Sequence, residues 1–509
     1  MENSRTKNAS RNIVYGWILK VIQILIPFAM RTVIIYNLGI EYLGLNSLFT
    51  SILQVLNLAE LGVGSAMVYS MYKPIIENDN SRLCALLNLY KLYYRVIGIV
   101  ISIIGLCLLP FIPELIAGSI PSNINIYILY LLNLASTVLS YWMFAYKSSI
   151  LQAYQRSDVI SKVSIITFSI QYGLQFLVLY LYRNYYYYVI VMLITQALTN
   201  VITAIMADYL YPNCRAYGKV EKSEIKSINQ HIRDLFTSKV GVIIYDSADT
   251  IIISAFLGLT ALAIYNNYFY ILNAISGMML VFFNSCLAGI GNSILTESKT
   301  KNMIDLNRLT FIVFWITGFC SISLLCLYQP FMKVWVGEKL LLSNAAVVLF
   351  VFYFYIRQFN SLLNLYKDAS GLWRKDRFRP LICAIVNLAL NILMVQYIGI
   401  YGVLLSTVLA ILIIGIPWII WNLLDSIFDK EEVGRYVNKM IFYFFVTVLV
   451  AILTYLLCNA FTISSAYINI IVRLLICVVL PNILFIVIFH GTNEYQYCVN
   501  LIRKMFNPK

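Results

Sequence analysis

Long apolar runs constrain the fold of this chain of 509 residues more than any other feature. There are about fourteen of them, each roughly 20 residues long, which is the length of a helix that crosses a bilayer core. Only 12% of the residues are charged and the mean hydropathy is +0.80, whereas a soluble domain carries about 25% charged residues. The short alternating segments of a membrane β-barrel are not seen. The sequence therefore predicts an all-α polytopic membrane protein.

The charges of the connecting segments support an even number of spans. Most of the 37 Lys and Arg residues lie in every second segment and at the two ends of the chain, whereas the segments between them carry Arg183, Lys333 and Lys339. Positive segments stay on the cytoplasmic side, so both termini are predicted to be cytoplasmic. The predicted spans are 13–36, 42–70, 88–111, 123–146, 159–182, 187–208, 234–257, 262–293, 309–330, 342–366, 380–397, 402–424, 440–460 and 466–489.

The first two spans carry polar groups on one side of each helix. One narrow stripe of the first span holds Lys20, Gln23, Pro27 and Arg31. One face of the second span holds Asn46, Thr50, Asn57, Glu60 and Gly64. Charges inside lipid-spanning helices are costly unless they face a polar interior. These two spans are therefore predicted to line a wet, charged cavity.

Two later spans carry similar groups. One face of the seventh span holds Lys239, Asp246, Asp249 and Thr250, and one face of the tenth holds Arg357, Asn360, Ser361 and Asn364. The two aspartates either pair with cations to hold the halves of the protein together or bind substrate or protons. An Arg beside amides suits an oxyanion such as phosphate, although the Asn residues suit a helix-packing cluster equally well.

The two halves of the chain are similar in sequence. RTVIIYNLGIEYLGL (31–45) aligns with DTIIISAFLGLTALAIY (249–265) when one inserted residue is allowed, and LQAYQRSDVISK lies where KDASGLWRKDRFRP lies in the second half. Each half begins on the cytoplasmic side, so the repeat is parallel, with a pseudo-two-fold axis along the membrane normal. Chance similarity between apolar segments is the alternative. The predicted parts are an N-lobe of helices 1–6 (1–208), a cytoplasmic linker (209–233), a C-lobe of helices 7–12 (234–424) and two C-terminal helices with a cytoplasmic tail (425–509).

Several function classes are excluded by what the sequence lacks. It has no phosphate-binding loop, HExxH or CxxC motif, and the external segments are too short for a catalytic domain. The ten cysteines are scattered through apolar spans, where they are predicted to be small packing residues. No enzyme activity, metal or cofactor is expected. The net charge of +14 is accounted for by cytoplasmic loops, so no nucleic-acid partner is expected.

Short motifs spread over most of the chain are similar to those of one transporter superfamily. They are Asn37-Leu38-Gly39 with Tyr42-Leu43-Gly44-Leu45, Glu60-Leu61-Gly62-Val63-Gly64-Ser65, Phe256-Leu257-Gly258 followed by Tyr265, Trp335-Val336-Gly337-Glu338, and Ile398-Gly399-Ile400-Tyr401-Gly402-Val403-Leu404-Leu405-Ser406-Thr407. Their order and the topology resemble the multidrug/oligosaccharidyl-lipid/polysaccharide exporter (MOP, MATE-like) superfamily. Within it, the chain resembles the Wzx-like flippases of O-antigen and capsule biosynthesis.

This resemblance implies two six-helix lobes in a V around a central cavity that opens alternately to each side. It also implies a substrate, an oligosaccharide on undecaprenyl pyrophosphate, that moves from the inner to the outer leaflet of a bacterial plasma (inner) membrane. Membrane lipids, a polysaccharide polymerase and other assembly proteins would be the partners.

The same resemblance suggests roles for the polar residues of the spans. The pyrophosphate and sugar head group would contact Arg31, Arg357, Lys20 and Lys239. A coupling H⁺ or Na⁺, or a switch between the lobes, would involve Asp246, Asp249 and Glu60. The rest of the cavity lining would come from Gln23, Asn46, Asn57, Asn360 and Asn364. The last two spans would form a lateral groove for the prenyl tail.

Two relatives with the same fold are the alternatives. A MATE-type cation or drug antiporter predicts that acidic residues dominate the cavity, whereas cations outnumber them here. A lipid II flippase shares the fold and the fourteen spans, and the sequence barely separates it from an O-antigen or capsule flippase. A membrane scaffold, a different class, predicts no polar stripe in mid-membrane and fits the sequence less well.

Overall fold

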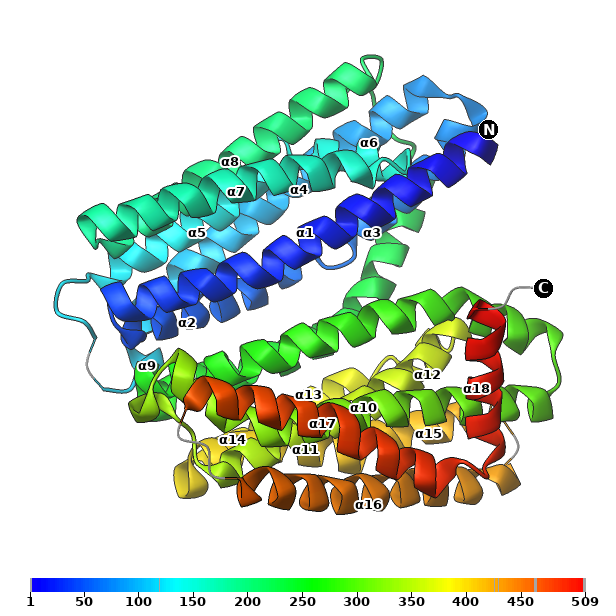
Figure 1. Cartoon of the computed structure of the whole chain (residues 1–509). Helices are drawn as coiled ribbons and strands as arrows, with labels where there is room; N and C mark the ends of the chain where they lie inside the picture. The colour runs from blue at the N-terminus through cyan, green and yellow to red at the C-terminus, as the bar shows by residue number, and fades with distance from the viewer. Residues whose placement is uncertain (1, 119, 425, 429, 462–464, 507–509) are drawn as a thin grey trace. The chain divides into compact units, whose positions relative to one another are not determined.

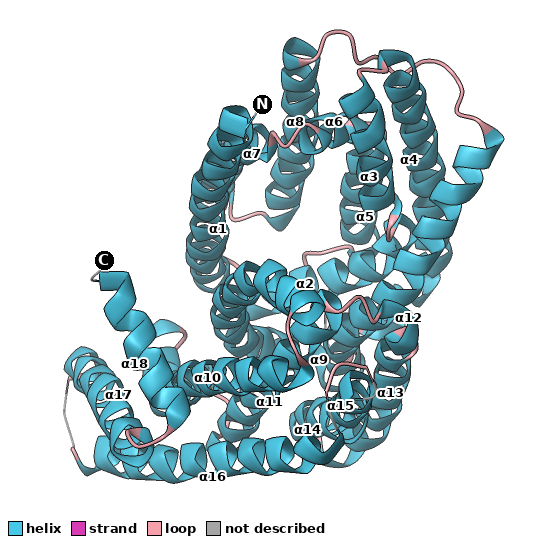
Figure 2. Cartoon of the chain, turned by 90° about the vertical axis from the view of Figure 1, so that its right-hand side faces the viewer, coloured by secondary structure: helices cyan, strands magenta, loops and turns pink. Residues whose placement is uncertain are grey.

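In the computed structural model the chain consists of helices and the loops that join them (Figure 1). The structure describes residues 2–118, 120–424, 426–428, 430–461 and 465–506, and no strand occurs within these ranges (Figure 2). The side chains of Lys239 and Asp246, two predicted site residues, lie outside the described part. The chain divides into two compact units, Met1–Ala263 and Ile264–Lys509, each with its own helix packing.

The first unit is a bundle in which α1 packs on α7, α7 on α8, α8 on α5 and α5 on α4. Several of its helices begin at Asp or Asn caps that accept backbone N–H groups, namely Asp79, Asn125 and Asn184. Its elements are α1 (Glu2–Asn37), α2 (Ile40–Leu56), η1 (Asn57–Glu60), α3 (Val63–Glu77), α4 (Asn80–Leu108), η2 (Leu109–Leu115), α5 (Ile126–Trp142), η3 (Ala145–Lys147), α6 (Ser148–Ala153), α7 (Ser157–Tyr182), α8 (Tyr185–Leu210) and the first part of α9 (Lys222–Thr296).

In the second unit, α10 packs against α11, α16 and α17, and α13 packs against α14. A buried cluster of aromatic side chains joins α10 to the last two membrane helices, with Phe314 stacked on Tyr443 at 4.4 Å between ring centroids. The elements are α10 (Lys299–Trp335), η4 (Glu338–Leu340), α11 (Asn344–Ala369), α12 (Trp373–Asp376), α13 (Arg379–Ile398), α14 (Ile400–Ala410), the π-helical turn η5 (Ile411–Gly415), α15 (Ile416–Leu424), α16 (Lys430–Ala460), α17 (Ala466–Phe489) and α18 (Asn493–Phe506).

Helix α9 is broken at Gly258, where φ is 86° and ψ is 176°. Only glycine adopts this conformation without strain. On the N-terminal side of the break, the Ala117 N–H donates to the carbonyl oxygen of Ser254 at 2.9 Å. On the C-terminal side, Gly44 of α2 packs directly on the backbone of Leu259, so closely that an added Cβ would lie 2.3 Å from its carbonyl oxygen. The break is therefore fixed by contacts within the first unit.

The helices agree with the predicted spans. Among the described residues, twelve helical segments are long and apolar enough to cross a membrane, and the pair α5 and α6, bent by 47°, makes a thirteenth. One of the twelve is Val240–Thr296, whose 57 residues would extend about 86 Å as a straight helix, far more than one bilayer core. Broken at Gly258, α9 corresponds to the two predicted spans 234–257 and 262–293, while the total of fourteen stays a prediction. The chain is a multi-pass membrane protein.

The two units share local features that the sequence alignment pairs with each other. Gly39, which precedes α2, has φ of 121° and ψ of 162°, close to the values at the aligned Gly258. Each unit also buries one aspartate beside two cations at a predicted cytoplasmic loop. Asp158 contacts Arg156 and Lys162, and Asp376 contacts Arg379 and Lys367. These features support an internal repeat, while the predicted lobe limits stay a prediction.

Candidate functional site

Glu60 lies where the second predicted span is interrupted. Helix α2 ends at Leu56, the short turn η1 follows, and α3 begins after Gly62, whose φ of 85° is left-handed. Asn and Gly are weak helix formers, and Gly takes this φ without a steric cost, so the local sequence NLAELGVG favours a break. The break presents a carboxylate part-way along a segment that crosses the membrane.

Three buried tyrosines from two neighbouring helices surround this carboxylate. Tyr94 of α4 donates to Oε1 of Glu60 at 2.7 Å, and Tyr141 of α5 donates to Oε2 at 2.7 Å. Tyr90 donates to the hydroxyl of Tyr94 at 2.7 Å, and the Tyr141 hydroxyl also lies 3.1 Å from Oδ1 of Asn57. Short O–H···O⁻ bonds of this kind are among the stronger hydrogen bonds in proteins. We call these five residues the Glu60–tyrosine cluster.

In the Glu60–tyrosine cluster, neutral hydroxyl donors satisfy both oxygens of the Glu60 carboxylate. The hydrogen-bonded chain from Tyr90 through Tyr94 to Glu60 lies between α4 and η1. Gly64 makes room for it, because a Cβ there would lie 3.1 Å from the Tyr90 hydroxyl. The cluster therefore unites two predicted site residues, Asn57 and Glu60, in one hydrogen-bond network.

The other predicted residues of the first unit are spread along their helices. Lys20 and Gln23 are exposed on α1, and Asn46 is half-buried on α2. Arg31 is half-buried on α1, where its charge interacts with the Tyr188 hydroxyl of α8. Asp249 of α9 is buried, with 9% of its surface exposed. Thus Arg31 is half-buried and Asp249 is buried, whereas Lys20 and Gln23 are exposed.

In the second unit, Arg357 is half-buried on α11. Its Nη1 group donates to Oδ1 of Asn273 on α9 at 3.0 Å, and its guanidinium lies 5.7 Å from the ring centroid of Tyr353. The guanidinium of Arg357 thus links α11 to α9 and lies near an aromatic ring, an environment that suits its planar charge.

The two predicted Asn residues of α11 have different surroundings. Asn364 accepts a hydrogen bond from Arg379 at 2.6 Å and so joins the network around Asp376. The Oδ1 atom of Asn360 is buried and has no hydrogen-bond partner among the described residues. It lies beside the π-helical turn, since a Cβ at Gly415 would be 3.8 Å from it. Asn364 therefore has a structural partner, whereas Asn360 keeps an unused acceptor.

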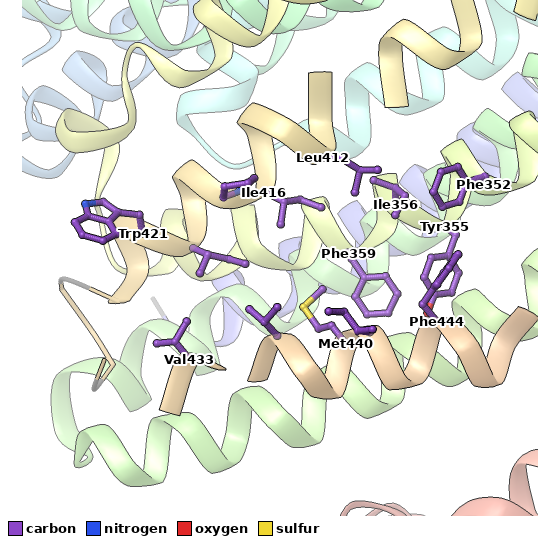
Figure 3. A pocket seen from close by; sticks show the side chains of 14 residues that line it. Phe352, Tyr355, Ile356, Phe359, Leu412, Ile416, Trp421, Val433, Met440 and Phe444 are labelled. Atoms are coloured by element: carbon purple, nitrogen blue, oxygen red, sulfur yellow. The ribbon is translucent and has the colours of Figure 1, made fainter. Parts of the chain in front are cut away.

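An apolar groove runs between α11, α15 and α16 in the second unit (Figure 3). Its volume is about 780 Å³, and the side chains of Phe359 and Met440 point into the space between the helices. The lining residues are Phe352, Tyr355, Ile356, Phe359, Leu412, Ile416, Pro417, Ile420, Trp421, Val433, Val437, Met440, Ile441 and Phe444. A groove of this composition suits a hydrocarbon chain.

The π-helical turn shapes one wall of this groove. Residues Ile411–Gly415 adopt the wider π geometry between α14 and α15, and Leu412 and Ile416 from this region line the groove. Such turns are rare and occur often at functional sites. Helix α16, the first of the two predicted C-terminal spans, forms the opposite wall. Of the last two spans, which the resemblance suggests form a groove for a lipid tail, α16 contributes lining residues to this groove and α17 contributes none, so that expectation stays a prediction.

Sequence reasoning missed the partners of the site residues. Tyr90, Tyr94 and Tyr141 lie 30 to 84 positions away from Asn57 and Glu60, and they are three among 39 tyrosines. The only sequence feature that pointed to these partners was the spacing of Tyr90 and Tyr94, which places both on one helix face. Nothing in the sequence distinguished Asn273 from the other amides of its span.

Comparison with solved structures identifies proteins of the same fold. The lipid II flippase MurJ in an inward closed conformation is similar with a TM-score of 0.64 at 15% identity, over 94% of this chain and 98% of that chain. An inward-facing multidrug resistance MATE family transporter of the MOP superfamily has a TM-score of 0.63 at 13% identity, over 83% of this chain and 99% of that one. A point mutant of the Vibrio cholerae MATE transporter VcmN has a TM-score of 0.56 at 14% identity, over 87% and 100%.

These matches rest on structure, since no family model and no curated protein matches the sequence. At 13 to 15% identity they establish the architecture and leave the substrate open. The matched chains are covered almost completely, so the whole fold is shared. The chain therefore has the fold of the transporters of the MOP superfamily.

Proposed function

We propose that this chain is a flippase that moves an undecaprenyl-pyrophosphate-linked oligosaccharide from the inner to the outer leaflet of the plasma membrane. The apolar groove between α11, α15 and α16 carries the proposal. A lipid-linked substrate needs a surface for its hydrocarbon tail beside the path of its polar head, whereas a small soluble cation does not. Because α16 belongs to the C-terminal pair of spans, this surface depends in part on a helix outside the predicted repeat.

The head group would be bound by the cations of the spans. Each guanidinium carries five N–H donors in a planar fork that matches phosphate oxygens, so Arg31 and Arg357 are the primary contacts in this proposal. Lys20 and Lys239 act as point charges for the same group. The amides Gln23, Asn46 and Asn360 hydrogen-bond the sugars.

The acidic residues would couple transport to an ion or to the conformational change. Glu60 takes up a proton in this proposal, because its carboxylate is held by hydroxyl groups, while Asp246 and Asp249 bind H⁺ or Na⁺ or pair with cations in one conformation. Asn57 orients Tyr141 toward Glu60. Polysaccharide polymerase and other assembly proteins are the proposed partners on the membrane.

Lipid II is the second candidate substrate. The match to the MurJ flippase covers 94% of this chain, more than the 83% covered by the MATE transporter with nearly the same TM-score. Lipid II transport would use the same groove and the same cations. A MATE-type exchange of organic cations is the third reading and would rest on Glu60 and Asp249 instead.

A binding measurement tests the role of the groove. Purified protein is titrated with undecaprenyl pyrophosphate and with farnesyl pyrophosphate, which shares the head group but has a short tail. Ile416→Trp fills the groove, and Ile413→Trp is the matched control, because Ile413 lies one turn away with 66% of its surface exposed. We expect Ile416→Trp to weaken binding of the long-chain ligand at least about tenfold, or about 1.4 kcal/mol, and Ile413→Trp to leave it unchanged. Equal affinity for both tails in the wild type, together with equal binding by both variants, would overturn the proposal.

A further inference from the structure

Three buried cysteines from three helices meet at one point in the second unit. Cys326 lies on α10, Cys458 on α16 and Cys477 on α17, and their sulfur atoms are all within 4.8 Å of one another. Their side chains are at most 1% exposed. They are far apart in the sequence, so only the fold brings them together. We call them the cysteine cluster.

A half-buried arginine links the same three helices. Arg473 of α17 donates from Nε to Oδ1 of Asn469 at 3.0 Å, from Nη2 to Oδ1 of Asn459 on α16 at 2.8 Å, and from Nη1 to the carbonyl oxygen of Cys326 at 3.3 Å. The cysteine cluster therefore has a fixed positive charge beside it.

A crevice with both apolar and polar lining residues reaches Cys326 of the cysteine cluster. It has a volume of about 490 Å³, and Cys326 is one of its lining residues. Its polar lining includes the amides Gln329, Asn344, Asn459 and Asn469 and the cations Lys333 and Arg473. The amide oxygens can coordinate an ion on its way to the sulfur atoms, so the cluster has an entry path, as a metal site requires.

We propose that Cys326, Cys458 and Cys477 bind one divalent thiophilic metal ion, with Zn²⁺ as the best fit. Sulfur ligands around tetrahedral zinc lie about 2.3 Å from the metal, hence about 3.8 Å apart, so each pair has to approach by at most about 1 Å. Binding converts three thiols to thiolates and releases three protons.

The charge of Arg473 favours a divalent ion. Three thiolates and a divalent ion carry one net negative charge, which the guanidinium of Arg473 neutralises, whereas a monovalent ion would leave a net charge buried in the membrane. The crevice supplies water for the fourth ligand position of zinc.

A metal at this point would fasten the C-terminal helices to the rest of the second unit. The ion would join α16 and α17 to α10, near the end of α16 that bears Cys458. The other part of α16 lines the apolar groove. The site is thus structural, and it holds in place one wall of the proposed tail-binding surface. It does not depend on the substrate proposed above.

The experiment measures metal bound to the reduced, full-length protein, purified with a tag that contains no histidine. Zinc is counted by elemental analysis after removal of loosely bound metal, and Cd²⁺ is titrated through its thiolate charge-transfer absorbance. Cys477→Ala and Cys458→Ala each remove one ligand. Cys383→Ala is the matched control, because Cys383 is also buried in a membrane helix but lies outside the cluster.

We expect one metal ion per chain in the wild type and in Cys383→Ala, with affinity reduced about 100-fold or more in Cys477→Ala and Cys458→Ala. Zinc should also raise the unfolding temperature of the wild type but of neither ligand variant. Wild-type protein that retains no zinc, a cadmium signal that survives both ligand substitutions, or a disulfide between two of the cysteines in protein purified without reductant would overturn the proposal. If one ligand variant fails to fold, the other variant and the wild-type stoichiometry still decide.

Discussion

Glu60→Gln removes the charge of the Glu60–tyrosine cluster while it keeps the shape of the side chain. In the wild type, the two carboxylate oxygens each accept a hydroxyl donor at 2.7 Å. A glutamine has one oxygen, so either Tyr94 or Tyr141 loses its acceptor and faces an N–H group instead. A charge-assisted hydrogen bond contributes about 1.5–3 kcal/mol, and burying a neutral amide costs less than burying a carboxylate, so we expect a net loss of about 1–2 kcal/mol in the free energy of unfolding.

The consequence for transport is a change in pH dependence. If Glu60 takes up the coupling proton, Glu60→Gln should transport at a rate that no longer follows pH across the range in which a carboxylate titrates. The assay compares initial flipping rates in proteoliposomes at several pH values with thermal unfolding of the same preparations. Glu77→Gln is the matched control. Glu77, at the end of α3, is also a carboxylate that follows α2 in the chain, but it is exposed and pairs with Lys73 at 3.7 Å. It should change unfolding by less than about 0.5 kcal/mol. A wild-type pH profile and wild-type stability in Glu60→Gln would refute the reasoning.

Three further predictions concern the framework around the site. Asp376→Asn should lower the free energy of unfolding by about 3–5 kcal/mol, because it leaves the buried charge of Arg379 without its carboxylate partner, whereas the more exposed pairs of Asp305 predict less than about 1 kcal/mol for Asp305→Asn in the same thermal unfolding assay. Gly44→Ala should cost about 1–3 kcal/mol by thermal unfolding, because its Cβ would meet the backbone of Leu259, while Gly16→Ala, inside α1 with nothing within 4 Å, should cost nothing or stabilise by up to about 1 kcal/mol. Burial alone would raise the pKa of Glu494 on α18, but its bond to Lys439 lowers that pKa below the ordinary value. The folded-state pKa is therefore the lower one, so the contact stabilises α18 above the ordinary carboxyl pKa of about 4.3 and is lost as pH falls through the folded-state value. Limited proteolysis should show α18 released at acid pH in the wild type, and already at neutral pH in Glu494→Gln.

Much of the fold could be predicted because long apolar runs identify the membrane helices and the charges of the loops indicate which side of the membrane each loop is on. The predicted spans 234–257 and 262–293 fall on either side of the break at Gly258, which the sequence alignment had already paired with Gly39. Both glycines have a positive φ, which favours glycine over other residues. The backbone conformation at these positions is therefore reflected in the residue type. Helix α18 falls in the predicted tail, because its 14 residues are too few for a span and include charged residues at 494, 503 and 504.

The site could be predicted only in part. Polar residues inside apolar spans stand out, which is why Glu60, Asn57 and Arg357 could be named from the sequence. Their partners could not, because Tyr94, Tyr141 and Asn273 are ordinary residues of other helices and become partners only through packing. The cysteine cluster could not be predicted from the sequence for the same reason, since its three members are on three separate helices.

The most direct test of the central claim is flipping by the purified protein in proteoliposomes. An undecaprenyl-pyrophosphate-linked oligosaccharide is placed in one leaflet, and its appearance in the other is followed with a membrane-impermeant glycan-modifying reagent. A parallel sample offers an organic cation with a sodium or proton gradient. The account predicts that the glycan reaches the far leaflet faster than in protein-free liposomes and more slowly with Arg357→Ala, while the cation is not exchanged. Exchange of the cation without movement of the lipid-linked glycan would contradict it.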